Sequence, residues 1–108
     1  MLAVESIAID SEGRLLVRPH ISKPKDYSLI WRDASGIRWD NTEKAFVAYE
    51  PTRWEHLPLL KQIVQAAFNE YGELLFVTED TQWRDVPPDL REQIEEHLRS
   101  EAIKKGNK

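Results

Sequence analysis

Tryptophan and arginine are the residue types in this chain best suited to binding another molecule. The 108 residues include four tryptophans, and Trp31 and Trp39 flank one expected turn, with Arg32 and Arg38 as their neighbours. Aromatic rings stack on ligands and anchor protein interfaces, and the arginines could give them a basic rim. We predict a ligand or partner site at Trp31, Arg32, Arg38, Trp39 and Trp83. The more ordinary interpretation is that two or three tryptophans fill a core between sheet and helix.

Metal and cofactor sites have no recognisable pattern in the sequence. His20, His56 and His97 are far apart and lack the local ligand spacing that is typical of zinc sites. The absence of cysteine excludes thiolate ligands, thiolate nucleophiles and disulfides. The four glycines are too scattered for a loop that binds phosphate. We expect no metal, no cofactor and surface positions for the histidines.

Catalytic side chains also lack a convincing arrangement. Ser35 precedes a glycine, but no strand-to-helix elbow and no nearby histidine accompany it. Carboxylate pairs suited to acid–base chemistry exist at Asp33 with Asp40 and at Glu92 with Glu96, although solvation explains both pairs as well. We therefore expect no catalytic residue and a protein that is not an enzyme.

Negative charge is concentrated in the second half of the chain. The formal net charge is -4, and the stretch from Glu70 to Glu96 holds nine acidic residues against Arg84 and Arg91. Binding to nucleic-acid phosphates requires a basic surface, so the composition disfavours a nucleic-acid partner. It permits a basic protein partner or mimicry of DNA, while a solvated helix face is the simpler explanation.

The composition indicates one globular domain outside the membrane. Hydrophobic residues make up 41% of the chain and charged residues 31%. No apolar run approaches the roughly 20 residues that a membrane span needs. Residues 1–7 lack the basic start of a secretory signal, so we expect a cytoplasmic protein.

The first half of the chain predicts short strands. Residues 2–9 and 14–18 alternate in polarity around turn residues 10–13, which predicts a β-hairpin. Leu15 and Val17 would share the buried face, and the neighbouring arginines would mark the wetter face. Three more strands are expected at residues 27–32, 37–39 and 45–49.

The second half predicts helices around a buried strand. A capping box at residues 52–55 and a stop at Gly72 bound the longest helical pattern. Pro58 lies inside that span, so either the first turn is distorted or the helix restarts near Pro58. A buried strand at residues 73–79, a polar loop at 79–85, and a last helix introduced by residues 86–89 follow.

Together these elements predict an α+β fold. We expect a mostly antiparallel meander sheet of about five to six strands, packed against one long helix, with a second helix at the C-terminus. The last helix would pack against the sheet edge or a second copy of the chain. The single domain would span residues 1–103, and residues 104–108 would form a frayed tail.

Several residues occur in an order that resembles a known group. Tyr27, Trp31, Arg32, Gly36, Trp39, Asp40 and Trp54 are followed by Tyr71-Gly72-Glu73-Leu74, by Thr81-x-Trp83 and by Val86-Pro87. This order, from Tyr27 to Leu98, is similar to that of small uncharacterised bacterial proteins carried on integron gene cassettes and other mobile elements. The resemblance implies a bacterial cytoplasmic accessory protein with an α+β fold, and it carries over no activity and no catalytic residue.

We interpret the chain as a non-enzymatic binding or interaction module, and we expect it to form a homodimer. Its surface would be the sheet that carries the tryptophans or the acidic C-terminal region. One alternative is an acidic inhibitor of a basic partner, of the immunity or antitoxin type. The other is a small enzyme or small-molecule binder with a pocket near the tryptophan-bearing sheet.

Overall fold

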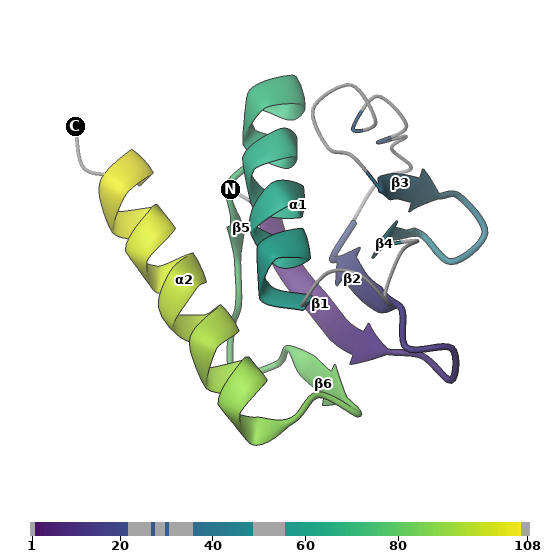
Figure 1. The fold of residues 1–108 in the computed structure, drawn as a ribbon. Coiled ribbons are helices and arrows are strands. Elements are labelled where there is room, and N and C mark those ends of the chain that lie inside the picture. The colour runs from purple at the N-terminus through teal and green to yellow at the C-terminus, as the bar shows by residue number, and fades with distance from the viewer. Residues whose placement is uncertain (1, 22–26, 28–29, 31–35, 49–55, 107–108) are drawn as a thin grey trace.

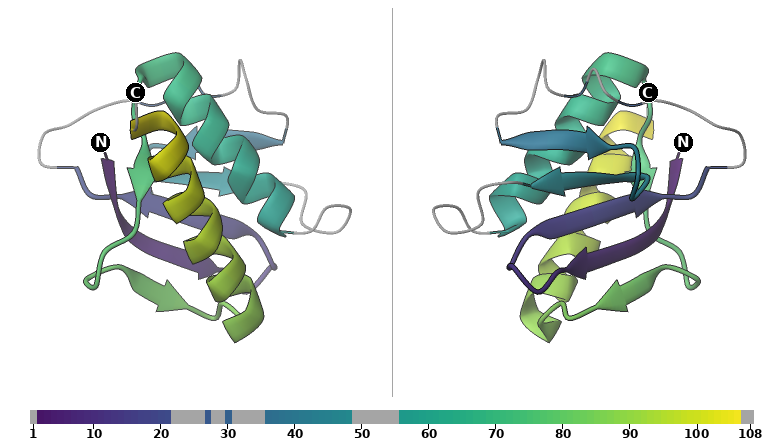
Figure 2. Two further views of the ribbon diagram at one scale, coloured as in Figure 1. Left: turned by 90° about the vertical axis from the view of Figure 1, so that its left-hand side faces the viewer. Right: turned by 90° about the vertical axis from the view of Figure 1, so that its right-hand side faces the viewer.

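Two helices pack on one face of a mixed sheet. A computed structural model describes residues 2–21, 27, 30, 36–48 and 56–106. Both helices lie on the same side of the strands, so in the described part of the chain no helix covers the opposite face of the sheet (Figures 1 and 2). The predicted α+β fold is confirmed, with elements β1 (Leu2–Ile9), β2 (Leu15–Pro19), β3 (Ile37–Asp40), β4 (Ala45–Ala48), α1 (His56–Tyr71), β5 (Leu75–Phe76), β6 (Gln82–Arg84) and α2 (Pro88–Gly106).

The sheet is mostly antiparallel but is not a simple meander. Its order is β3-β4-β2-β1-β5, and β6 also pairs with β1. The pairs β1–β2, β2–β4 and β3–β4 are antiparallel, whereas β5 and β6 both run parallel to β1. β5 pairs with Leu2 and Ala3, and β6 pairs with the stretch from Ser6 to Ala8. One edge of β1 is therefore covered by two short strands, one after the other.

The predicted hairpin of β1 and β2 is confirmed. The Asp10 carboxylate accepts hydrogen bonds from the backbone N–H groups of Glu12 and Arg14, at 2.9 and 2.8 Å, and from Arg14 Nε at 2.9 Å. Gly13 follows with φ of 82°, a conformation that glycine adopts without strain. Leu15 and Val17 are fully buried, as the alternation predicts.

The aromatic segment before β3 is different from the prediction. A strand was expected at residues 27–32, of which the structure describes Tyr27 and Ile30, and neither lies in a strand. The Ile30 N–H donates to the Tyr27 carbonyl at 3.2 Å, which is a turn contact. The strand prediction is wrong at these two residues because a turn also places positions three apart on one buried side. The Tyr27 ring packs edge-on against Trp39, Phe46 and Tyr71.

Helix α1 begins at His56, so Pro58 lies in its first turn. Proline suits this position because the N–H groups of a first turn have no partner within the helix. The helix ends as predicted at Gly72, which has φ of 65° and donates its N–H to the Phe68 carbonyl at 2.9 Å. The capping box predicted at residues 52–55, including Trp54, lies outside the described residues. The buried face of α1 consists of Leu59, Leu60, Ile63, Val64, Ala66 and Ala67.

The segment between the helices forms two short strands instead of one strand and a loop. The strand expected at residues 73–79 is limited to β5, and β6 lies within the expected loop at 79–85. A three-residue strand is too short to show periodicity, and β6 is defined by its pairing with β1.

Helix α2 runs to Gly106 and therefore includes residues expected in the frayed tail. Its Ile94 and Leu98 are buried in the core against α1 and β5. In the described part of the chain, no helix has the length and apolar character required to cross a membrane.

Candidate functional site

A small side chain at the centre of β1 creates the floor of a groove on the uncovered face of the sheet. The register of β1 with β2 shifts between Val4 and Ser6, which marks a β-bulge at Glu5. Because of the bulge, Val4 and Ile7 both reach the core although they are three positions apart. Ser6, which is 6% exposed, lines the groove on the opposite face.

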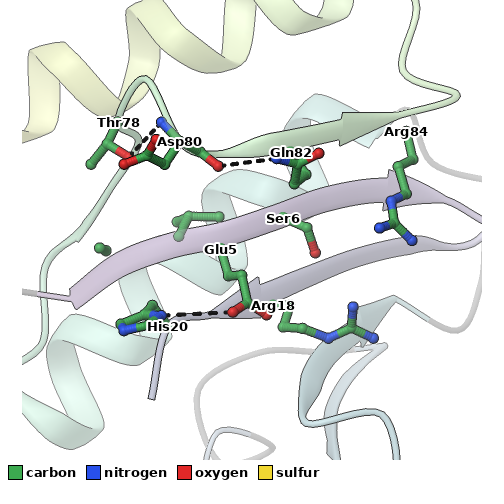
Figure 3. Close-up of a pocket in the computed structure, with 10 residues that line it drawn as sticks. Glu5, Ser6, Arg18, His20, Thr78, Asp80, Gln82 and Arg84 are labelled. Atoms are coloured by element: carbon green, nitrogen blue, oxygen red, sulfur yellow. Dashed lines mark hydrogen bonds and ion pairs between the residues drawn. The ribbon is translucent and has the colours of Figure 1, made fainter. Parts of the chain in front are cut away.

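Longer polar side chains stand on both sides of this floor. In β2 the residue paired with Ser6 is Arg18, and in β6 it is Gln82. Arg84 pairs with Ala8, two residues further along β1. The resulting groove has a volume of about 560 Å³ and is shown in Figure 3. It is lined by Ala3, Val4, Glu5, Ser6, Arg18, His20, Thr78, Asp80, Gln82 and Arg84.

The loop between β5 and β6 forms one rim of the groove. Thr81 is buried there, donates its hydroxyl to the Val4 carbonyl at 2.7 Å, and accepts the Thr78 N–H at 2.9 Å. The Thr78 hydroxyl in turn accepts the Asp80 N–H at 3.1 Å. Thr81 thus joins the loop to β1 at the point between the two short strands, and it holds Thr78 and Asp80 beside the groove.

Opposite charges occupy different parts of the groove. Arg18 is held by Glu43, with Nε 3.0 Å from the Glu43 carbonyl and one terminal nitrogen 3.6 Å from its carboxylate. Arg18 and Arg84 extend along one end in Figure 3. At the other end, Glu5 lies 3.6 Å from Nδ1 of His20. The groove therefore offers a basic end and an end that contains carboxylates.

The chain also matches known proteins. The family model for the integron cassette protein Hfx_Cass5 matches residues 3–81. The chain belongs to this family. The resemblance predicted from the sequence is thus confirmed. The matched residues run from Ala3 in β1 to Thr81, whereas β6 and α2 follow them in the sequence.

A solved structure of an integron cassette protein is also similar to this chain. It is described as Hfx_Cass5 from the mobile metagenome of the North West Arm sewage outfall. The two chains are 28% identical over 92% of this chain and 96% of that chain, with a TM-score of 0.41. No match was found among curated proteins.

In this integron cassette protein, the predicted site residues that the structure describes are Arg38, Trp39 and Trp83. None of these three lines the groove. Trp39 is 7% exposed and packs against Phe46, with ring centroids 5.1 Å apart. Arg38 is exposed on the other face of β3. Trp31 and Arg32 lie outside the described residues. The prediction of an aromatic surface that includes them stays a prediction.

Trp83 is the last predicted site residue. Its neighbours Gln82 and Arg84 line the groove, but Trp83 itself faces the helices. It pairs with the buried Ile7 and packs against the core. The Arg91 guanidinium carbon of α2 lies 4.9 Å from the centroid of its ring. Trp83 therefore anchors β6, and in doing so it positions Gln82 and Arg84 on the uncovered face.

Sequence reasoning missed most residues of the groove. Arg14 and Arg18 were predicted on the wetter face of the second strand, and Arg18 of β2 does lie there, but no local signal connects it with the polar residues of β1 and β6. The alternation of Gln82-Trp83-Arg84 is the one pattern that could have indicated the second side of the groove. Across the described residues, no three His, Asp or Glu side chains are grouped so as to hold a metal ion.

Proposed function

We propose that this integron cassette protein is a non-enzymatic binding protein whose ligand site is the groove on the uncovered face of the sheet. The observation that supports it is the concave shape of that face, with a small floor between longer polar side chains on β2 and β6. Ligand sites are typically concave and carry a few convergent polar groups. A volume of about 560 Å³ suits a small molecule.

The position of His20 supports binding over catalysis. A serine nucleophile needs a base within hydrogen-bond reach. The His20 N–H donates to the Ala3 carbonyl, which places its backbone three residues along β1 from Ser6, a distance of roughly 10 Å. Its ring is directed toward Glu5 (Figure 3). Ser6 and His20 thus line one groove without forming a nucleophile–base pair.

Filling the groove tests the proposal. A small-molecule library would be screened by thermal shift on the natural protein, and each hit would be repeated on Ala3→Phe, which adds an aromatic ring at the floor. Ala102→Phe is the matched control, because Ala102 lines a separate hollow between β5 and α2. We expect hits whose stabilisation is lost in Ala3→Phe and kept in Ala102→Phe.

The opposite pattern would reject the proposal. If every hit still stabilised Ala3→Phe, or if stabilisation were lost only in Ala102→Phe, the ligands would bind outside the groove. Circular dichroism of both variants without ligand checks that the added ring leaves the fold intact.

A further inference from the structure

We propose that Arg18, Arg84 and the Ser6 hydroxyl bind the oxyanion group, a carboxylate or a phosphate, of a small molecule. The inference rests on the proposed function, since it assigns a ligand class to the same groove. It follows from the register of three strands, from the contacts that hold one arginine, and from polar groups that have no partner among the described residues.

The register brings the two arginines to opposite sides of β1, with Arg18 beside Ser6 and Arg84 beside Ala8. Arg18 is paired with Ser6 across the β1–β2 ladder, and Gln82 is paired with Ser6 on the other side. Arg84 lies two residues beyond Gln82 on the same face of β6. Neighbouring strands are about 4.8 Å apart, so two long side chains that flank one strand can meet above it. Figure 3 shows both guanidinium groups at the same end of the groove, with the Ser6 hydroxyl between β2 and β6.

Arg18 is held in place before any ligand arrives. Its Nε–H donates to the Glu43 carbonyl, and a terminal nitrogen forms an ion pair with the Glu43 carboxylate. A guanidinium group has five N–H donors, so donors remain for a ligand. Fixing a side chain in advance reduces the conformational entropy lost on binding.

Arg84 and Ser6 provide the groups that lack a partner. Within the described part of the chain, no ion pair or hydrogen bond engages the Arg84 guanidinium or the Ser6 hydroxyl. Arg84 is exposed, whereas Ser6 is 6% exposed and its side chain borders the groove. A serine hydroxyl at the groove can donate a hydrogen bond to a ligand oxygen, and a guanidinium group matches the two oxygens of a carboxylate or phosphate.

The acidic residues at the other end limit the ligand. Glu5 and Asp80 line the same groove and would repel a second negative charge placed near them. The site therefore suits a small molecule with its oxyanion at one end and a neutral or cationic group at the other. A long polyanion is excluded by the same argument.

Nuclear magnetic resonance titration with simple anions tests the assignment. The natural protein, labelled with ¹⁵N, would be titrated with inorganic phosphate and separately with acetate, at constant ionic strength set by chloride. We expect saturable shifts of the backbone amides of Ser6, Gln82 and Arg84. Arg84→Gln should weaken binding about tenfold, whereas Arg99→Gln, a change at an exposed arginine of α2, should leave it unchanged.

Each outcome decides a separate question. Saturation by phosphate or acetate identifies which oxyanion is preferred, and either result supports the inference. Absence of saturable shifts with both anions, or equal weakening by both variants, would overturn it. In that case library hits lost in Ala3→Phe would still support the proposed function, so the two proposals fail independently.

Discussion

At the scale of single residues, Thr81 joins the loop between β5 and β6 to strand β1. Its hydroxyl both donates to Val4 and accepts from Thr78, in a site that is 7% exposed. Hydrogen bonds of this kind matter mainly because their loss leaves buried polar groups without a partner.

Thr81→Val keeps the shape of the side chain and removes both hydrogen bonds. We expect the free energy of unfolding to fall by about 2 kcal/mol, because the Val4 carbonyl and the Thr78 N–H lose their partner. Urea denaturation measures the change. The control is Thr42→Val in an exposed turn, for which we expect a change within about 0.5 kcal/mol. Equal effects in the two variants would show that the Thr81 hydroxyl contributes nothing specific.

Asp10 makes the hairpin turn sensitive to acid. Partial burial alone would raise the pKa of the Asp10 carboxyl, but hydrogen bonds from Arg14 and from the Glu12 N–H, with the charge of Arg14, outweigh burial and lower the pKa below its ordinary value. A lowered pKa in the folded state means that the carboxylate contributes stability above the unfolded pKa of about 3.9. That contribution is lost as the pH falls through the folded pKa.

The Asp10→Asn variant measures how much the Asp10 carboxylate contributes to the free energy of unfolding. We expect it to be less stable than the natural protein by roughly 1 kcal/mol at neutral pH, because charge-assisted hydrogen bonds in a half-exposed turn are weakened. The difference should shrink in acid, below the lowered pKa. Urea denaturation at several pH values between about 2 and 7 measures it. A difference independent of pH would contradict the explanation.

At the scale of elements, α2 combines a buried stripe with an exposed surface. Ile94 is fully buried, while Ile103 in the same helix is 62% exposed. The narrow apolar stripe of this helix therefore supplies core residues over its first three turns and little beyond them.

The two isoleucines of α2 form a matched pair for mutation. Ile94→Ala should lower the free energy of unfolding by about 3 kcal/mol, since it removes buried methyl groups and leaves a cavity. Ile103→Ala should change it by less than about 0.5 kcal/mol, because its side chain is in water in the folded state as well. Urea denaturation of both variants measures the contrast. Similar losses in the two variants would mean that Ile103 is covered in solution.

Elements with local signals were predictable, and β6 shows why others were not. The hairpin of β1 and β2 follows from alternation and turn residues close together in the sequence, and the end of α1 follows from Gly72. In β6, by contrast, three residues become a strand because they pair with residues 6–8, more than 70 positions earlier. The strand prediction at residues 27–32 failed at Tyr27 and Ile30, the two residues of that span that the structure describes, because a turn contact joins them.

At the scale of the whole molecule, the sequence indicated layers but not the groove. The apolar pattern of α1 predicted one long helix packed against a sheet, as observed (Figure 2). Helix α2 was expected at the sheet edge or against a second copy of the chain, and it packs beside α1 and against β5 on the same side of the sheet. The groove depends on which strands flank β1, and strand order is a property of the complete fold. Arg18 and Arg84 are separated by 66 positions in the sequence, and no local pattern connects them.

The pairing of β1 with late strands also affects synthesis of the chain. Ribosomes add residues from the N-terminus, so β1 and β2 exist before β6 is made. At roughly 5 to 20 residues per second, the interval between residues 19 and 84 lasts roughly 3 to 13 s. During that time one edge of β1 has no strand to pair with, and unpaired edges invite association with other chains. The charged Glu5 at the bulge of β1 is the kind of residue that discourages such association on a nascent chain.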